Sequence, residues 1–457
     1  MNRRQFLNHA CATGTTTLTA ATTLGTLGMM RNASAQTASD YKALVCILLA
    51  GGNDSYNMVV PSDTAQHSAY ASIRSDLALA RETLLPLSFP NTGARSFGLH
   101  PGMGRVAQLI NSGDAAVIAN VGTLLEPFDA TAVENGTATL PVGLFSHADQ
   151  IAQWQTAMPG QRSSIGWGGR MADLMQGMNL SNGVSMNVSL SGTNTFQSGR
   201  STNEFSITSQ GDGALSINGY GEDSFFGDFR RRTTDGVLNA PRTQLLRAEY
   251  RQRFRNAIDA NTTFATAMQS ASELQTNFSE NGLSSAMRQI ARVISVRDNL
   301  GASRQTFFVT VGGWDHHDEV IQNQARMLPM VSDALGEFRD ALVELGVFND
   351  VTTFTISDFA RTLTSNGRGS DHGWGGHHIV MGGSVAGGQM FGDYPILAMN
   401  SALDVGRGIY APTTATDEYF ADLALWYGVT DGALETVLPN VRRFAATGGA
   451  PLGLFGV

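Results

Sequence analysis

Three runs of strand length that are rich in apolar residues, each followed by an aspartate, constrain the fold most strongly. The runs cover residues 41–49, 305–311 and 351–356. A run without polar alternation indicates a strand buried on both faces, as in a parallel sheet that helices cover. An acid follows each run within a few residues, at the sheet edge where open α/β folds bind ligands. These three acids are Asp54, Asp315 and Asp358.

Segments with helical periodicity alternate with these strands. Further strands are predicted at 115–121 and 184–190, and helices at 147–157, 166–177, 320–345 and 417–428. The alternation predicts an α/β fold, a three-layer α/β/α sandwich with a mostly parallel central sheet. We expect residues 36–457 to form a single domain. Residues 191–240 are rich in Ser, Gly, Thr and Asn and predict a polar insert or a long surface loop, whereas 241–300 are predicted to be helical.

Composition excludes two classes of protein. Hydrophobic residues make up 42% of the chain and charged residues 15%, which is typical of a folded protein and not of a disordered one. The net charge is −9 and the sequence contains no basic run. Because nucleic-acid affinity depends on clustered Lys and Arg, a nucleic-acid partner is not expected.

The first 35 residues have the features of an export signal. Arg3-Arg4 resembles the twin-arginine motif, a mildly apolar stretch follows from Ala10 to about Met30, and Ala33-Ser34-Ala35 offers a cleavage site near Ala35. The simpler alternative is a frayed basic N-terminus. The signal predicts a periplasmic or exported protein that uses the twin-arginine translocase as its partner during export.

Histidines gather near the predicted strand ends. Five of the nine histidines lie within residues 316–378, beside Asp315, Asp358 and Asp371. Imidazole together with carboxylate suits Zn, Fe or Mn, whereas carboxylate alone favours Mg or Ca. Each acid taken alone could be a turn former or a helix cap. Their joint position predicts a site for one or two divalent metal ions.

A hydrolase also needs a nucleophile, and Ser146 is the candidate. It stands where a helix should begin, and the helix N-terminus offers N–H groups to an anion. The alternatives are that Ser146 is an ordinary N-cap, that Ser55 attacks, or that a water activated by metal does so. His147 binds either metal or anion, or only caps the helix. No Walker A sequence is present.

A series of motifs gives the chain a family resemblance over the whole mature region. They are, in order, Leu-Ala-Gly-Gly-Asn-Asp-Ser-Tyr-Asn (49–57), Gly-Leu-His-Pro-Gly-Met (98–103), Ser-His (146–147), Gly-Trp-Gly-Gly-Arg (166–170), Trp-Asp-His-His (314–317), Ser-Asp-Phe-Ala-Arg-Thr (357–362), Asp-His-Gly (371–373) and Gly-Gly-Gln-Met-Phe-Gly-Asp-Tyr-Pro (387–395). The chain resembles the bacterial "domain of unknown function 1501" family, which is similar to the alkaline phosphatase and sulfatase superfamily. The resemblance implies an alkaline-phosphatase-like sandwich with a metal site at the strand C-termini.

The resemblance also implies roles for individual residues. It implies metal ligands at Asp54, Asp315, His317, Asp358 and His372. For the anionic group of a substrate, His147, Arg170 and Arg361 are the candidates, although either arginine could equally form a structural salt bridge.

Two functions are compatible with these features. The first is a periplasmic metal-dependent hydrolase of phosphate or sulfate esters, acting on a small-molecule or glycan substrate. The alternative is a non-catalytic binding or assembly protein of the same fold, acting in cell-surface or polysaccharide processes.

Overall fold

A computed structural model describes residues 41–456, apart from 181–182, 216, 218, 221 and 241–243. The predicted signal peptide and its cleavage site near Ala35 lie outside the described residues. In the described part of the chain, no helix combines the length and the apolar character that crossing a lipid bilayer requires.

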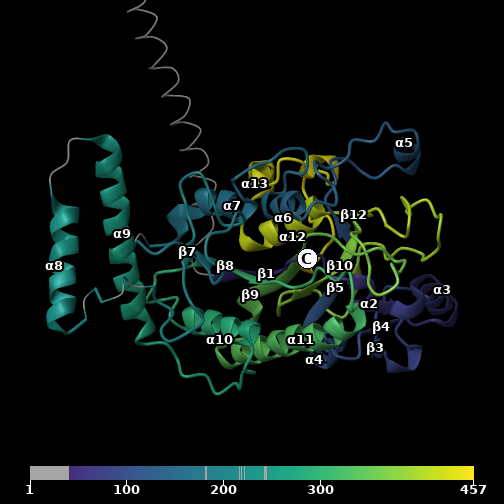
Figure 1. Cartoon of the computed structure of the whole chain (residues 1–457), viewed down its shortest axis with the longest axis horizontal. Helices are drawn as coiled ribbons and strands as arrows, with labels where there is room; N and C mark the ends of the chain where they lie inside the picture. The colour runs from purple at the N-terminus through teal and green to yellow at the C-terminus, as the bar shows by residue number, and fades with distance from the viewer. Residues whose placement is uncertain are drawn as a thin grey trace, which may run out of the picture.

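A mixed, mostly parallel sheet forms the centre of the molecule (Figure 1). Strand β1 (Lys42–Leu49) pairs in parallel with β8 (Arg304–Val311) on one side and with β9 (Val351–Ser357) on the other. Strand β10 (Gly376–Met381) is antiparallel to both of its neighbours, β9 and β5 (Ala115–Gly122). Short parallel strands complete the sheet at both ends: β6 (Asn187–Ser189), β7 (Phe205–Ser206), β11 (Met390–Phe391) and β12 (Thr414–Ala415).

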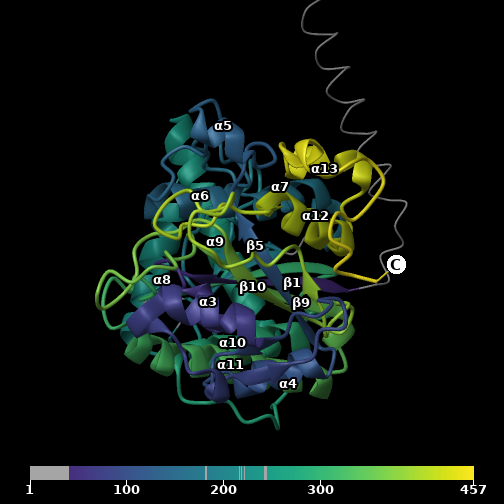
Figure 2. The same ribbon diagram turned by 90° about the vertical axis from the view of Figure 1, so that its right-hand side faces the viewer.

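Helices cover both faces of the sheet, as Figures 1 and 2 show from two directions. One layer contains α4 (Gly104–Asn111), α10 (Gly282–Ser295) and α11 (Val320–Glu344), and the other contains α6 (His147–Thr156), α7 (Trp167–Met175), α12 (Thr416–Tyr427) and α13 (Leu434–Val437). Alternate residues of β1 enter the two cores: Val45 and Ile47 pack in one, and Leu44 and Cys46 in the other. This two-sided burial explains why the strand is an apolar run, and it gives the predicted α/β/α sandwich.

Smaller elements surround the sandwich. A second sheet consists of β2 (Val59–Pro61), β3 (Leu85–Leu87) and β4 (Phe97–Leu99), and the remaining α-helices of the described residues are α2 (Ser55–Met58), α3 (Thr64–Arg74), α5 (Ala130–Glu134), α8 (Phe225–Asn239) and α9 (Leu245–Met268). The predicted polar insert at 191–240 contains regular structure, because β7 adds a strand beside β6 and α8 forms a hairpin with α9. It is therefore not simply a long loop.

The central strands end at one level. Leu49 of β1 is in register with Val311 of β8 and with Ser357 of β9. Three loops therefore leave the sheet side by side, and they carry Asp54, Asp315 and Asp358. The pairing of these strands brings together chain segments that are about 300 residues apart in sequence.

Helix α12 contains two buried carboxyl groups in contrasting surroundings. Asp422 accepts hydrogen bonds from the backbone N–H groups of Leu452, at 3.1 Å, and Leu454, at 2.7 Å. In the described part of the chain, neither carboxylate oxygen of Asp417 has a hydrogen-bond partner on another residue. Burial raises the pKa of Asp417 to about 8, despite the opposing charge of Arg170. Asp417 therefore favours the folded state when it is protonated.

We expect the free energy of unfolding to fall as pH rises from about 4 to about 8. Unfolding lowers the pKa of Asp417 to about 3.9, so the folded state binds the extra proton within this window, and stability is lost as pH rises through the folded pKa. Asp417→Asn should remove a large part of this slope and be more stable than the natural chain at pH 8, by a few kcal/mol. Urea denaturation at a series of pH values measures both effects.

Asp422→Asn is the matched control. An amide offers one acceptor oxygen where two backbone N–H groups need partners, so this variant should lose about 1–3 kcal/mol of stability, the opposite sign to Asp417→Asn. Burial raises the pKa of Asp422 as well, so this variant also removes the part of the pH slope that Asp422 contributes. Equal pH slopes in the natural chain and in Asp417→Asn would contradict the assignment.

Candidate metal centre

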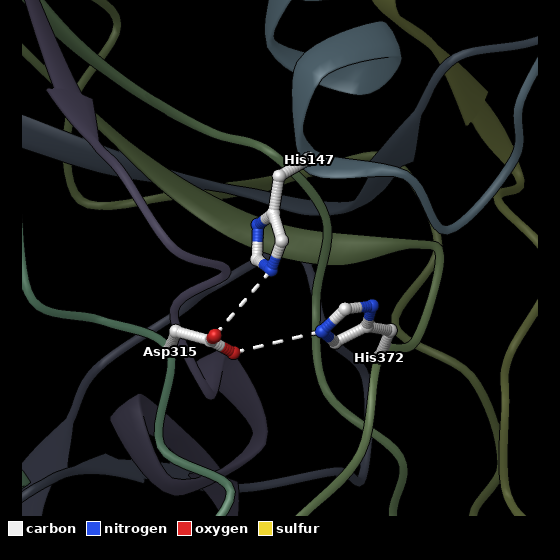
Figure 3. A group of neighbouring side chains, drawn as sticks. All are labelled: His147, Asp315 and His372. Carbon is white, nitrogen blue, oxygen red and sulfur yellow. Dashed lines mark ion pairs between the residues drawn. The ribbon is translucent and has the colours of Figure 1, made fainter.

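Three histidines and one aspartate meet where the central strands end, and Figure 3 shows His147, Asp315 and His372 of this group. Asp315 follows β8, and His317 lies two residues later. His147 is the first residue of α6, and His372 lies in the connection between β9 and β10. We call these four residues the His–Asp cluster.

The ligand atoms of the cluster lie close together. The Nε2 atom of His317 is 3.1 Å from Oδ1 of Asp315 and 3.0 Å from Nε2 of His372. The Nε2 atoms of His372 and His147 each lie 3.5 Å from an Asp315 oxygen. His147, Asp315 and His372 offer ligand atoms that all lie within 4.8 Å of one another. Metal–ligand bonds of about 2.0–2.2 Å place neighbouring ligand atoms roughly 3–3.6 Å apart, so these spacings fit a metal ion.

An acceptor holds the opposite nitrogen of each imidazole ring. Nδ1 of His147 is 2.7 Å from Oδ2 of Asp358, and Nδ1 of His317 is 3.3 Å from Oδ1 of Asp371. Nδ1 of His372 is 2.8 Å from the carbonyl oxygen of Phe145. Because carboxylates and carbonyls only accept, they place the ring proton on Nδ1 and leave the lone pair on Nε2. This is the arrangement that orients histidines around metal ions.

Burial and charge favour the protonation states that a metal needs. Partial burial raises the pKa of Asp315, but the hydrogen bond and charge of Arg361 outweigh it and hold this pKa below its usual value. Burial also lowers the pKa of His372. At neutral pH Asp315 is therefore an anion and His372 is neutral. The side chain of Asp315 is 47% exposed, so the cluster is open to solvent and to a ligand.

Backbone conformation supports the cluster at two points. Gly51, after β1, has φ +122°, and a Cβ there would lie 2.4 Å from the backbone nitrogen of Asp315. Only glycine allows the two loops to approach this closely. Phe145 has φ +72°, which is rare for an aromatic residue, and its carbonyl accepts the proton of His372. Such strain is a feature of functional sites.

Asp54, which the resemblance implies as a metal ligand, is not one of the four residues of the His–Asp cluster. It is buried, and its Oδ2 forms an ion pair with Arg74 of α3, which is also buried. The hydroxyl of Ser370 lies 3.3 Å from the same oxygen. The guanidinium of Arg74 balances the charge of Asp54, whereas Oδ1 of Asp54 is buried without a hydrogen-bond partner among the described residues.

Asp358, which the resemblance also implies as a direct ligand, contacts the cluster through His147. It is buried after β9, and its oxygens accept hydrogen bonds from the imidazole of His147 and from the backbone N–H of Gly51. Burial raises the pKa of this carboxyl, and the hydrogen bond from His147 opposes the rise. Asp358 thus positions His147, while His147, predicted as an anion-binding residue, takes a place in the cluster.

Both arginines predicted to hold an anion use their guanidinium groups for contacts within the protein. Arg170 donates to the carbonyl oxygens of Thr156, Ile165 and Val437. Arg361 is fully buried and donates to four backbone carbonyls and to Asp315. Both arginines hold loops together, which is why their motifs appeared functional.

The two candidate serines have structural contacts. Ser146 is the N-cap of α6, and its hydroxyl accepts from the backbone N–H of Asp149 at 3.5 Å. Ser55 is buried, and its hydroxyl accepts from the backbone N–H of His377 at 2.9 Å. Ser146 directly precedes His147 in sequence, and the observed contact of its hydroxyl is that of a cap.

Sequence reasoning missed two positioning groups, Asp371 and the carbonyl of Phe145. Asp371 was noted as part of Asp-His-Gly without a role, and it holds both His317 and the exposed guanidinium of Arg407. A backbone carbonyl has no sequence signal of its own. In the sequence, only the pair Asp371-His372 hints that other groups hold the imidazole rings of His317 and His372.

Comparison with solved structures finds proteins with little sequence similarity. Ps i-CgsB, solved in complex with k-i-k-neocarrahexaose, is 8% identical, and the match covers 89% of this chain and 78% of that chain with a TM-score of 0.34. The PsFucS1 sulfatase from Pseudoalteromonas sp. is 8% identical, with 89% and 71% covered and a TM-score of 0.34. A mutant of the alkaline phosphatase PafA is 12% identical, with 72% and 64% covered and a TM-score of 0.24.

Family membership rests on the sequence itself. No curated protein matches the chain. The family model described as "Protein of unknown function (DUF1501)" matches residues 41–435, which include every member of the His–Asp cluster. The chain therefore belongs to the DUF1501 family.

Proposed function

We propose that this protein is a metal-dependent hydrolase of phosphate or sulfate esters. The observation that carries the proposal is the His–Asp cluster, in which three imidazole Nε2 atoms surround one half-exposed carboxylate. Three imidazoles and one carboxylate favour Zn, Mn or Fe over Mg or Ca. The residues fit a metal because each ring proton is held on the far side, and Nε2 of His147 is buried without a hydrogen-bond partner among the described residues.

The surroundings of the cluster suit an anionic ester. A bound divalent metal supplies Lewis acidity, which polarises the bond to be broken and activates a nucleophile. Asp358 and Asp371 hold two of the imidazoles, and Arg407 places an exposed positive charge beside Asp371. A substrate with a negative group can approach from this open side.

One observation favours the alternative, a metal-binding protein without catalysis. Both arginines that were expected to hold the anion are directed to backbone carbonyls, and Ser146 serves as a cap. In this alternative the cluster stabilises a binding or assembly protein. With the signal predicted at residues 1–35, we propose a periplasmic or exported location for either function.

Turnover of nitrophenyl phosphate and nitrophenyl sulfate by the purified chain, supplied with Zn, Mn or Fe, tests the proposal. We expect hydrolysis of one of the two esters and its loss on chelation. Metal binding without hydrolysis of either ester would favour the non-catalytic alternative.

Ser146→Ala tests the nucleophile in the same assay. Because the hydroxyl caps α6, we expect this variant to lose about 1 kcal/mol of stability and to retain turnover. Thr is the control substitution, since it caps nearly as well as Ser. If Ser146→Ala abolished turnover with metal content and melting temperature unchanged, Ser146 would be the nucleophile and not only a cap.

A further inference from the structure

The α8–α9 hairpin stands away from the body of the molecule (Figure 1). Helices α8 and α9 lie side by side, and the body end of α9 is anchored by the buried residues Ala260, Phe264, Ala267 and Met268. Phe264 packs against Phe205 of β7, with ring centroids 5.2 Å apart. The His–Asp cluster has no residue in this hairpin.

Large apolar side chains are exposed along the hairpin. On α8 these are Phe225, Phe226, Phe229 and Val237, which are 81%, 70%, 61% and 61% exposed. On α9 they are Leu245, Leu246 and Tyr250, at 82%, 84% and 68%. Scattered exposed apolar residues are normal on a protein surface, but a gathering of this kind marks an interaction site.

The exposed face of α8 is amphipathic, with its apolar side turned outward. At 100° per residue its four exposed apolar side chains fall within an arc of about 120°, and Arg230 and Arg232 flank the two edges. The buried residues Gly227 and Leu238 lie on the opposite side, toward the molecule. An apolar face bordered by arginines is typical of helices that lie in a membrane interface.

The net charge of the hairpin is opposite in sign to that of the whole chain. Helices α8 and α9 contain seven arginines and four acidic residues, a net charge of +3, in a chain whose net charge is −9. Three of the acids are already paired with arginines of the hairpin, in Arg231–Asp228, Arg253–Glu249 and Arg255–Asp235. The hairpin therefore presents positive charge together with exposed Phe and Leu.

We propose that the α8–α9 hairpin docks on an anionic phospholipid surface. Arginines on the hairpin contact lipid phosphates, while Phe225, Phe226 and Phe229 enter the headgroup region. A second copy of the chain fits less well, because contact between two hairpins brings together two positive surfaces. The acidic body of another copy is the other possible occupant, and the experiment below distinguishes it from a lipid surface.

Co-sedimentation with vesicles tests the proposal. The full chain should bind vesicles of phosphatidylglycerol and phosphatidylcholine in equal parts, bind vesicles of phosphatidylcholine alone at least about tenfold more weakly, and lose affinity at high salt. Combined Phe225→Ser, Phe226→Ser and Phe229→Ser should reduce binding about tenfold or more, and so should Arg232→Glu with Arg247→Glu.

The matched control replaces exposed apolar residues elsewhere, Leu140→Ser, Leu180→Ser and Ile396→Ser, and should bind like the natural chain. Equal melting temperatures in all variants show that the fold is intact. Absence of vesicle binding, or equal loss in the control, would overturn the proposal. A dimer in solution that the phenylalanine variant dissociates, without vesicle binding, would identify a second copy as the occupant instead.

Discussion

Arg74→Met should destabilise the folded protein by about 3–5 kcal/mol, because it leaves the carboxylate of Asp54 buried and unpaired. Both side chains are fully buried, so solvent does not screen the loss. Arg74 also donates to the carbonyl oxygen of Thr362 at 3.1 Å, and this bond connects α3 to the loop after β9. Urea denaturation measures the change in the free energy of unfolding.

A double-mutant cycle isolates the pair. The double variant Asp54→Asn/Arg74→Met should be at least about 1 kcal/mol more stable than the sum of the two single changes predicts. Strict additivity would show that the two groups do not interact. Asp54→Asn should also leave metal content unchanged, whereas a loss of metal in this variant would restore Asp54 as a ligand.

The second large effect concerns the His–Asp cluster. Asp315→Ala and His372→Ala should each remove most of the metal affinity and with it the turnover, because each supplies a ligand atom at the centre of the cluster. Asp358→Asn should have a smaller effect, about 10–100-fold in metal affinity, since Asp358 acts on the cluster by positioning His147. Isothermal titration with Zn or Mn gives the affinities.

His67→Ala is the control for the loss of an imidazole. His67 lies on α3, and its Nε2 contacts the carbonyl oxygen of Leu79. The metal affinity and the turnover of the His67→Ala variant should equal those of the natural chain. If His372→Ala bound metal as tightly as His67→Ala, the cluster would not be the metal site.

The fold was largely predictable because its strands are buried on both faces. The strands predicted at 305–311 and 351–356 correspond to β8 (Arg304–Val311) and β9 (Val351–Ser357), and the helix predicted at 320–345 is α11 (Val320–Glu344). Weaker patterns were less informative. The strand predicted at 184–190 is reduced to β6 (Asn187–Ser189), and the polar composition of 191–240 concealed α8.

The sequence predicts the position of a site residue only where that residue follows a predicted strand. Asp315 and His317 follow β8 directly, so their place at the sheet edge followed from the strand. The partner of Asp54 did not, because Arg74 comes from α3 and only tertiary packing directs it inward. His147 likewise reaches the cluster from α6, in a different layer, and the acceptor that fixes its tautomer lies 211 residues away.

Metal analysis of the purified mature chain tests the central claim most directly. The protein is incubated with Zn, Mn or Fe, and unbound metal is removed. Elemental mass spectrometry should then find about one equivalent of one of these metals per chain. The same treatment of a variant with both His147→Ala and His372→Ala should find almost none. A natural chain that retains none of the three metals, or a double variant that retains as much as the natural chain, would contradict a metal centre at the His–Asp cluster.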